Sequence, residues 1–317
     1  GAAARPRDRY ITRMQALAER LAAARTGAAV GPVTSRGLVR VHGKDRQGFV
    51  HRMCTQKVAG LAPGAAAHVA FLDVKGHVVA EGTLLVRADD LLLVAEPAAA
   101  EPVRAHLTRY VVMDQVKLED VSAAWRVVPA LGPRGIELAR SEAAPGQVWD
   151  DALRGAPAVM VVLRAEEAAA FRDRMIAAGS VALDDGDLEV LRVTAGIPRF
   201  GADVDHSRLP MEAGLIRTAV SFDKGCYLGQ EVVLRGTFRG QVQRGLVQLE
   251  LPPGAAPGAA LSAAGNEVGV LTSAVETPEG RLGLGYVRRA HWKAGERLAT
   301  AGGEAVVRRV LVEERDR

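Results

Sequence analysis

The chain has 317 residues, of which 48% are apolar and 25% charged, with 41 Lys and Arg against 37 Asp and Glu. This composition is that of an ordinary globular protein with room for two or three domains. The net charge of +4 and the lack of a dense Lys/Arg run argue against nucleic-acid binding, although a mildly basic protein suits an anionic small molecule. The sequence has no apolar run long enough to cross a bilayer, and we expect no signal peptide.

The two cysteines, Cys54 and Cys226, lie far apart in the sequence, and neither belongs to a Cys-x-x-Cys pair. This usage fits a reduced cytoplasmic protein better than a disulfide scaffold. It also argues against a zinc or iron–sulfur site built by this chain alone. We therefore expect a cytoplasmic monomer without a metal of its own.

In chain order, hydrophobic periodicity predicts four parts. An N-terminal amphipathic helix and linker (1–36) is followed by two α+β units (37–132 and 133–242) and a small C-terminal β-barrel (243–317). The N-terminal helix covers 8–25, and its apolar side is formed by Ile11, Met14, Leu17 and Leu21. Further elements are expected as strands at 38–41, 68–72, 78–86, 91–95, 116–118, 125–128, 159–163, 246–251, 268–272, 282–287 and 306–312, and as helices at 46–54, 98–110, 135–140, 166–179 and 188–195.

The most distinctive run is Lys-Gly-Cys-Tyr-Leu-Gly-Gln-Glu at residues 224–231, closed by Arg235. Two glycines, Gly225 and Gly229, favour a sharp turn around the thiol, and a short helix is expected from Gln230. A thiol before a helix N-terminus and near Lys224 favours its thiolate form. The alternative is a small buried cysteine in a tight turn, because free cysteine is among the most buried residue types.

This run resembles the signature of the YgfZ-type folate-binding proteins, which are relatives of the glycine-cleavage T-protein, an aminomethyltransferase. The resemblance continues upstream at 196–203 and 209–215 and covers most of the chain. It implies two α+β units with a closing barrel, tetrahydrofolate or a derivative as ligand, and iron–sulfur enzymes or assembly factors as partners. It implies that Cys226 and Lys224 form the reactive centre, with binding residues Glu81, Arg192, Thr194, Arg199, Glu212, Tyr227, Gln230, Glu231 and Arg235.

The resemblance to aminomethyltransferases fails at two places. Ala80 and Glu81 stand where that family carries paired aspartates, one of which serves near the folate nitrogen N10. Thr194 stands where it carries a glutamate that grips the pteridine, and a hydroxyl lacks the bidentate, charge-assisted pairing of a carboxylate. Both departures favour a protein that is not an aminomethyltransferase.

Three functions remain open at this stage. The leading hypothesis is a folate-binding protein that supports the assembly or repair of iron–sulfur clusters. The alternatives are a folate-dependent one-carbon transferase and a scaffold that has lost its ligand. In the first hypothesis Arg235, Arg239 and Arg244 form either a basic rim for a glutamate tail or an ordinary solvated surface.

Overall fold

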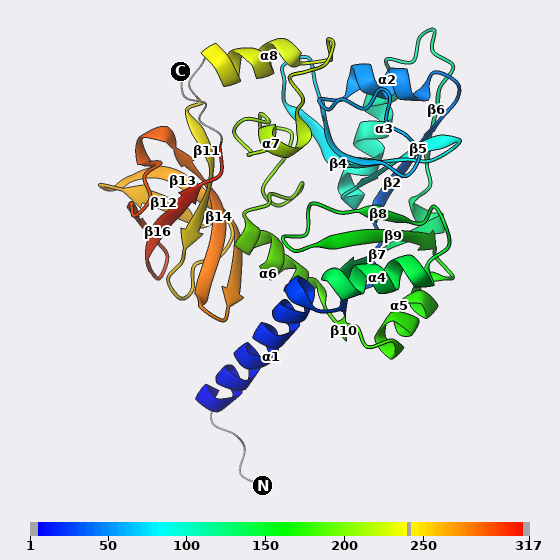
Figure 1. Ribbon diagram of the computed structural model, residues 1–317. Helices are drawn as coiled ribbons and strands as arrows, with labels where there is room; N and C mark the ends of the chain where they lie inside the picture. Colours follow the sequence, from blue (N-terminus) through cyan, green and yellow to red (C-terminus); the bar gives the residue numbers. More distant parts are fainter. Residues whose placement is uncertain (1–5, 240–241, 313–317) are drawn as a thin grey trace.

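The structure is a computed structural model that describes residues 6–239 and 242–312, in which the chain forms two five-stranded sheets and a closed barrel. Figure 1 shows the barrel on the left and the two sheets stacked on the right, with α6 lying between the barrel and the lower sheet. The α+β class and the C-terminal barrel are therefore confirmed.

The first sheet is antiparallel and has the strand order β3-β4-β5-β2-β6. Its interior strand β4 is covered on both faces: Ala80, Leu84 and Val86 lie in the core of this unit, and Leu85 faces the second sheet. The predictions for 78–86 and 91–95 are correct to within one residue. The elements are β2 (Gly37–His42), α2 (Arg46–Met53), β3 (Ala66–Leu72), β4 (Val78–Val86), β5 (Asp90–Ala95), α3 (Ala100–Thr108) and β6 (Lys117–Asp120).

The second sheet has the order β10-β1-β7-β9-β8. Helices α4 and α5 pack on one face, and Val127, Trp149, Met160 and Val162 on the other face pack against the first sheet. Strands β1 and β7 precede residue 133 yet belong to this sheet, so the two sheets interleave in sequence. The elements are β1 (Ala29–Val30), β7 (Trp125–Leu131), α4 (Pro133–Glu142), β8 (Val148–Asp150), β9 (Ala158–Arg164), α5 (Ala168–Ala177) and β10 (Val181–Ala182).

Two helices join the second sheet to the barrel. In α1 (Pro6–Thr26), Met14, Leu17 and Leu21 enter a core shared with α6 and barrel strands, whereas Ile11 is 44% exposed. Helix α6 (Asp185–Ala195) begins three residues earlier than predicted, because Asp184 and Asp187 form a capping box.

The barrel closes through six strands in the order β11-β14-β13-β12-β15-β16. The four long strands were predicted, and the two four-residue strands β12 and β15 were not. The bounds are β11 (Arg244–Glu250), β12 (Ala260–Ala263), β13 (Asn266–Thr277), β14 (Gly280–Arg288), β15 (Arg297–Thr300) and β16 (Gly303–Val310). Within the described ranges, no helix combines the length and the apolar character that a membrane crossing requires.

The segment between α6 and the barrel returns to the first sheet. It contains α7 (Ile216–Ala219), α8 (Gln230–Leu234) and a π-helical turn (Arg235–Arg239), and its apolar residues complete the core of the first unit. Because this segment carries the signature run, the first sheet is the platform on which the signature loop is built.

Candidate functional site

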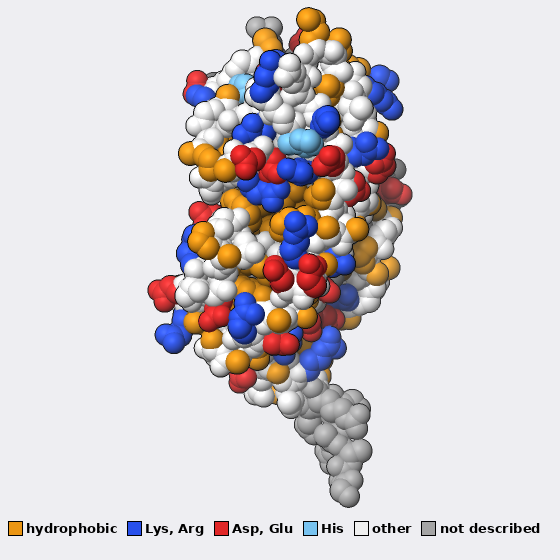
Figure 2. All heavy atoms as spheres, turned by 90° about the vertical axis from the view of Figure 1, so that its right-hand side faces the viewer, with side chains coloured by type: hydrophobic (Ala, Val, Ile, Leu, Met, Phe, Trp, Pro, Cys, Tyr) orange, Lys and Arg blue, Asp and Glu red, His pale blue; other side chains and the backbone are white. Residues whose placement is uncertain are grey.

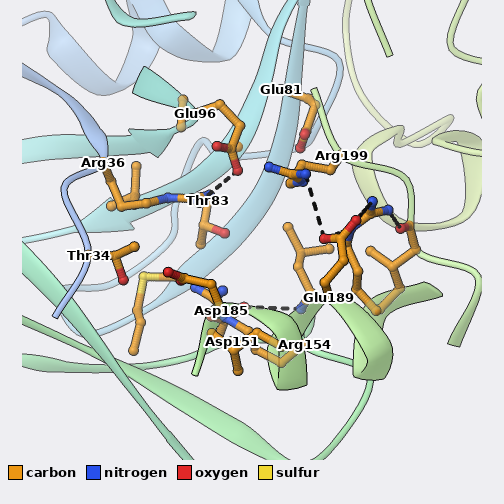
Figure 3. A pocket seen from close by; sticks show the side chains of 18 of the residues that line it. Thr34, Arg36, Glu81, Thr83, Glu96, Asp151, Arg154, Asp185, Glu189 and Arg199 are labelled. Carbon is orange, nitrogen blue, oxygen red and sulfur yellow. Dashed lines mark hydrogen bonds and ion pairs between the residues drawn. The ribbon is translucent and has the colours of Figure 1, made fainter. Parts of the chain in front are cut away.

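A cavity of about 520 Å³ lies between the two sheets and α6 (Figure 3). This volume is in the range of small-molecule sites, about 300–1,000 Å³. The wall comes from four places: the segment before β2, strands β4 and β5, the segment after β8 with Met160 of β9, and α6 with the segment that follows it.

The cavity wall carries four arginines and five carboxylates, and Figure 2 shows basic and acidic side chains likewise interspersed on the face of the molecule that it presents. Most of these charges are paired across the cavity edge: Arg36 with Glu96 at 2.7 Å, and Arg154 with Asp151. The carboxylates and arginines that line it are Glu81, Glu96, Asp151, Asp185, Glu189, Arg36, Arg154, Arg192 and Arg199. Such a wall can bind a polar molecule that has both N–H donors and acidic groups.

Two arginine donors in the wall have no acceptor. The Nε atoms of Arg36 and Arg199 are buried and lack a hydrogen-bond partner among the described residues. Arg199 reaches Glu189 only at 3.6 Å. A buried donor without a partner costs about 1–3 kcal/mol, so these atoms favour an acceptor from a ligand.

Glu81 is a buried carboxylate of the cavity wall with two hydrogen-bond partners. Its Oε2 lies 2.8 Å from His68 Nε2, and its Oε1 accepts a hydrogen bond of 3.2 Å from the backbone N–H of Phe200. Burial alone would raise the pKa of Glu81, but these contacts with His68 and Phe200 and the charge of Arg36 hold it below its ordinary value. Figure 3 shows Glu81 and Arg199 on the same side of the cavity.

The neighbouring Ala80 lies in the opposite face of β4. It is fully buried in the core of the first unit, because successive side chains of a strand point to opposite faces. Only one of the two positions compared with paired aspartates therefore reaches the cavity. The alternative interpretation of Glu81 as an exposed strand residue is wrong, since it is 6% exposed.

Arg192 lines the cavity but is held by a network of its own. Its guanidinium donates to Asp203 at 2.7 Å, to the Ser273 hydroxyl at 2.7 Å and to the carbonyl of Ile197 at 2.9 Å, and it also pairs with Glu189. Burial would lower the pKa of Arg192, but Glu189 and Asp203 raise it above its ordinary value. Arg192 thus joins α6 to the barrel.

Thr194 does not line the cavity. It lies on the barrel side of α6, where its carbonyl accepts hydrogen bonds from Gln248 and Arg309. The cavity positions of α6 are instead Asp185, Gly186, Leu188, Glu189 and Arg192.

The signature loop forms a second, separate region, because none of its residues lines the cavity. Lys224 binds the backbone at the end of α2. Its Nζ donates to the carbonyls of His51 and Cys54 at 2.6 Å and of Gln56 at 3.1 Å. The lysine therefore fastens the loop to the C-terminal end of α2, and burial lowers its pKa.

The thiol of Cys226 is exposed, whereas that of Cys54 is buried. The alternative interpretation of Cys226 as a small buried cysteine in a tight turn is therefore wrong. Beside it, Tyr227 is 7% exposed, and burial raises its pKa to about 12. The two glycines differ: Gly229 has φ +81°, and a Cβ there would lie 2.8 Å from the carbonyl oxygen of Asp73, but a Cβ at Gly225 would meet open space.

The remaining predicted residues lie around the loop or beyond it. Gln230 and Glu231 begin α8, and no ion pair joins Glu231 to Arg235 in the described part of the chain. Glu212 is buried, accepts from the backbone of Leu209, and pairs with Arg244 at 3.3 Å. The side chain of Arg239 lies outside the described residues, so the basic rim of Arg235, Arg239 and Arg244 stays a prediction.

Sequence reasoning missed most of the cavity wall. Its members Thr34, Arg36, Glu96, Asp151, Arg154, Asp185 and Glu189 come from segments far apart in the chain. One signal was available: Glu189 precedes Arg192 by three residues, which places both on one face of a helix. Among the described residues, no three His, Cys, Asp or Glu side chains are grouped to hold a metal ion.

Comparison with known proteins agrees with this architecture. Residues 5–152 match the GCVT N-terminal domain family, and residues 243–311 match the CAF17 C-terminal beta-barrel domain family. The aminomethyltransferase of Rubrobacter xylanophilus is 27% identical over 288 residues, which cover 84% of this chain and 77% of that protein. The mitochondrial iron–sulfur cluster assembly factor IBA57 of Mus musculus is 27% identical over 302 residues, covering 86% and 80%.

The crystal structure of the glycine cleavage system aminomethyltransferase T from Bartonella henselae superposes with a TM-score of 0.80. It covers 92% of this chain and 88% of that one at 20% identity. The chain has the T-protein fold. Its sequence combines a region that matches the GCVT N-terminal domain with one that matches the CAF17 C-terminal beta-barrel.

Proposed function

We propose that this chain binds tetrahydrofolate or a derivative in the cavity between the two sheets and supports the assembly or repair of iron–sulfur clusters through its signature loop. Its relatives include proteins named as aminomethyltransferases and as iron–sulfur cluster assembly factors. The observation that carries the folate part is the cavity, whose carboxylates and unpartnered arginine donors match the two chemical ends of a folate.

The residues present fit such a ligand. A pteridine exposes a donor edge of amino and ring N–H groups, which a carboxylate such as Glu189 or Asp185 accepts in pairs. The benzoyl-glutamate end carries carbonyl and carboxylate oxygens, which suit Arg36 and Arg199. Bound there, the folate would supply a one-carbon carrier, and the chain would hold and orient it.

Aminomethyl transfer is the weaker candidate. Ala80 is in the core, so β4 presents a single carboxylate to the cavity, and that carboxylate is engaged by His68 and Phe200. Thr194, which stands for the pteridine-gripping glutamate, faces the barrel. We therefore propose a binding protein rather than an aminomethyltransferase.

The iron–sulfur part of the proposal depends on Cys226. Its thiol is exposed on a loop that Lys224 and Gly229 hold against the first sheet. One thiol supplies one ligand, so a cluster handled here needs further ligands from a partner or a small molecule. Partners would be iron–sulfur enzymes or assembly factors.

Calorimetric titration of tetrahydrofolate tests the folate part. We expect wild type and Cys226→Ser to bind equally, because Cys226 lies outside the cavity. Arg199→Gln should weaken binding by roughly 10- to 100-fold, since a hydrogen bond to a charged group contributes about 1.5–3 kcal/mol. Arg13→Gln, on the exposed side of α1, is the matched control. Lack of binding to wild type would refute the folate site and leave the scaffold alternative.

Complementation tests the thiol. In cells that lack this protein, Cys226→Ser should fail to restore the activity of an iron–sulfur enzyme although it folds and binds folate. Full restoration by Cys226→Ser would contradict the role of the thiol and leave the folate site standing.

A further inference from the structure

A chain of hydrogen bonds leads from the cavity to the outer surface of the first unit. Thr218 Oγ1 lies 2.9 Å from His68 Nδ1, and His68 Nε2 lies 2.8 Å from Glu81 Oε2. Thr218 is exposed, whereas the side chains of His68 and Glu81 are each 8% exposed. Glu81 is the only member of the three that lines the cavity.

The fold fixes this arrangement from three elements. His68 on β3 pairs with Thr83, and Glu81 on β4 pairs with Ala70, so the two side chains are diagonal neighbours on one face of the sheet. Thr218 belongs to α7, and its carbonyl accepts a hydrogen bond of 3.1 Å from Gln56. Phe200 fixes the second oxygen of Glu81 through its backbone N–H.

The partners of His68 also define its tautomer. Glu81 is an acceptor when ionised, so His68 carries its proton on Nε2, and Nδ1 then accepts from the Thr218 hydroxyl. Both hydrogen bonds consequently have a donor facing an acceptor in one direction, from Thr218 towards the cavity.

We infer that Thr218, His68 and Glu81 form a proton relay that connects solvent with the cavity. In one passage, Thr218 gives its hydroxyl proton to His68 Nδ1 and regains one from water. His68 gives its Nε2 proton to Glu81, and Glu81 passes it to the bound molecule. One proton enters and one leaves, no electron moves, and the reverse passage restores the starting tautomer.

The relay implies a chemical property of the molecule that binds in the cavity. Its ligand has a basic atom, such as a ring or secondary-amine nitrogen, that gains or loses a proton beside Glu81. The charged groups that face Glu81 are His68 on β3, Arg36 before β2 and Arg199 after α6. The hydrogen bonds from His68 and Phe200 and the charge of Arg36 favour the carboxylate form of Glu81 between passages, so Glu81 passes its proton on promptly when a ligand accepts it.

The inference rests on the proposed function for the identity of the ligand, but its test uses no ligand. In protein labelled with ¹⁵N-histidine, NMR should show His68 as the Nε2–H tautomer, with its signal assigned by its loss in His68→Gln. The exchange of this proton with water requires both ends of the relay.

We expect Thr218→Val to slow that exchange by about 100-fold, an ordinary contribution of a positioned acid or base, because valine keeps the shape and removes the hydroxyl. Thr218→Ser retains the hydroxyl and should exchange as fast as wild type. Equal exchange in wild type and Thr218→Val, or an Nδ1–H tautomer in wild type, would overturn the relay. Failure of tetrahydrofolate to bind would instead refute the proposed function and leave the exchange result valid.

Discussion

Replacing Lys224 by methionine removes an ammonium group that donates to three backbone carbonyls, those of His51, Cys54 and Gln56. The apolar part of the side chain is kept, so the change isolates the charge and its hydrogen bonds. The ammonium also lies 4.9 Å from the ring centroid of Tyr227.

The size of the effect follows from these contacts. A hydrogen bond to a charged group contributes about 1.5–3 kcal/mol, and a cation–π contact adds about 0.5–1 kcal/mol. Part of this is offset because methionine has no charge to desolvate. We expect the docking of the signature loop on α2 to weaken by about 3 kcal/mol, which corresponds to about a 100-fold larger open population.

The reaction of Cys54 with a thiol reagent such as Ellman's reagent measures that opening. Cys54 is buried beneath the loop, and its thiol donates to the carbonyl of Gln56 at 3.2 Å. The chain has two cysteines, so Cys226→Ser leaves Cys54 as the only thiol. In this background Lys224→Met should raise the rate of Cys54 modification by about two orders of magnitude.

Lys57→Met is the matched control. Lys57 is half-exposed and pairs at 2.9 Å with the exposed Asp223, an ion pair that solvent screens and that adds little to stability. An unchanged rate at Cys54 in Lys224→Met, equal to that of the control, would refute the view that Lys224 fastens the loop.

Three further predictions concern the loop, the cavity and the barrel. Gly229→Ala should destabilise the protein by about 1–3 kcal/mol in urea unfolding, because φ is +81° and the added Cβ meets the carbonyl of Asp73. Gly225→Ala is the control and should leave the stability unchanged, because its Cβ meets open space. Equal free energies of unfolding for the two variants would contradict this account. The pKa of Glu81 is below its ordinary value, so its contribution to the free energy of unfolding is present above the unfolded-state pKa and is lost as the pH falls through the folded-state pKa. Glu81→Gln should therefore flatten the pH dependence of the free energy of unfolding in that acidic range. Parallel curves for wild type and Glu81→Gln would contradict this prediction. Arg192→Met leaves Asp203 buried without its cation and should lower the free energy of unfolding by about 3–5 kcal/mol. An unfolding midpoint equal to that of wild type would contradict this prediction.

Much of the fold could be predicted because its long elements carry strong local patterns. Strand β4 is a nine-residue run with apolar ends, and α6 follows an acidic cluster that caps it. The two-residue strands β1 and β10 and the three-residue β8 have no such pattern, since their pairing depends on partners more than a hundred residues away or on the turn before β9. Local sequence cannot predict strands that exist only because a sheet offers them an edge.

The candidate site could be predicted only in part for the same reason. The signature run is contiguous, so its turn and its short helix were recognisable, and the position of Gly229 confirms the need for a left-handed residue there. The cavity is assembled from segments that meet only after both sheets have formed. Nothing in the spacing of Lys224 and Cys226 indicated that the lysine would donate to backbone carbonyls at the end of α2.

The segment that follows α6 explains how two separate regions can belong to one function. Its Phe200 binds Glu81 at the cavity, and three residues later Asp203 binds Arg192 of α6 and the hydroxyls of Thr272 and Ser273 in the barrel. The same chain then continues to Thr218 and to the signature loop, which rest on the first sheet. This segment is therefore bonded to the first sheet at Glu81 and to the barrel at Thr272 and Ser273. The cavity and the Cys226 loop share one continuous stretch of chain, although no residue of the loop lines the cavity.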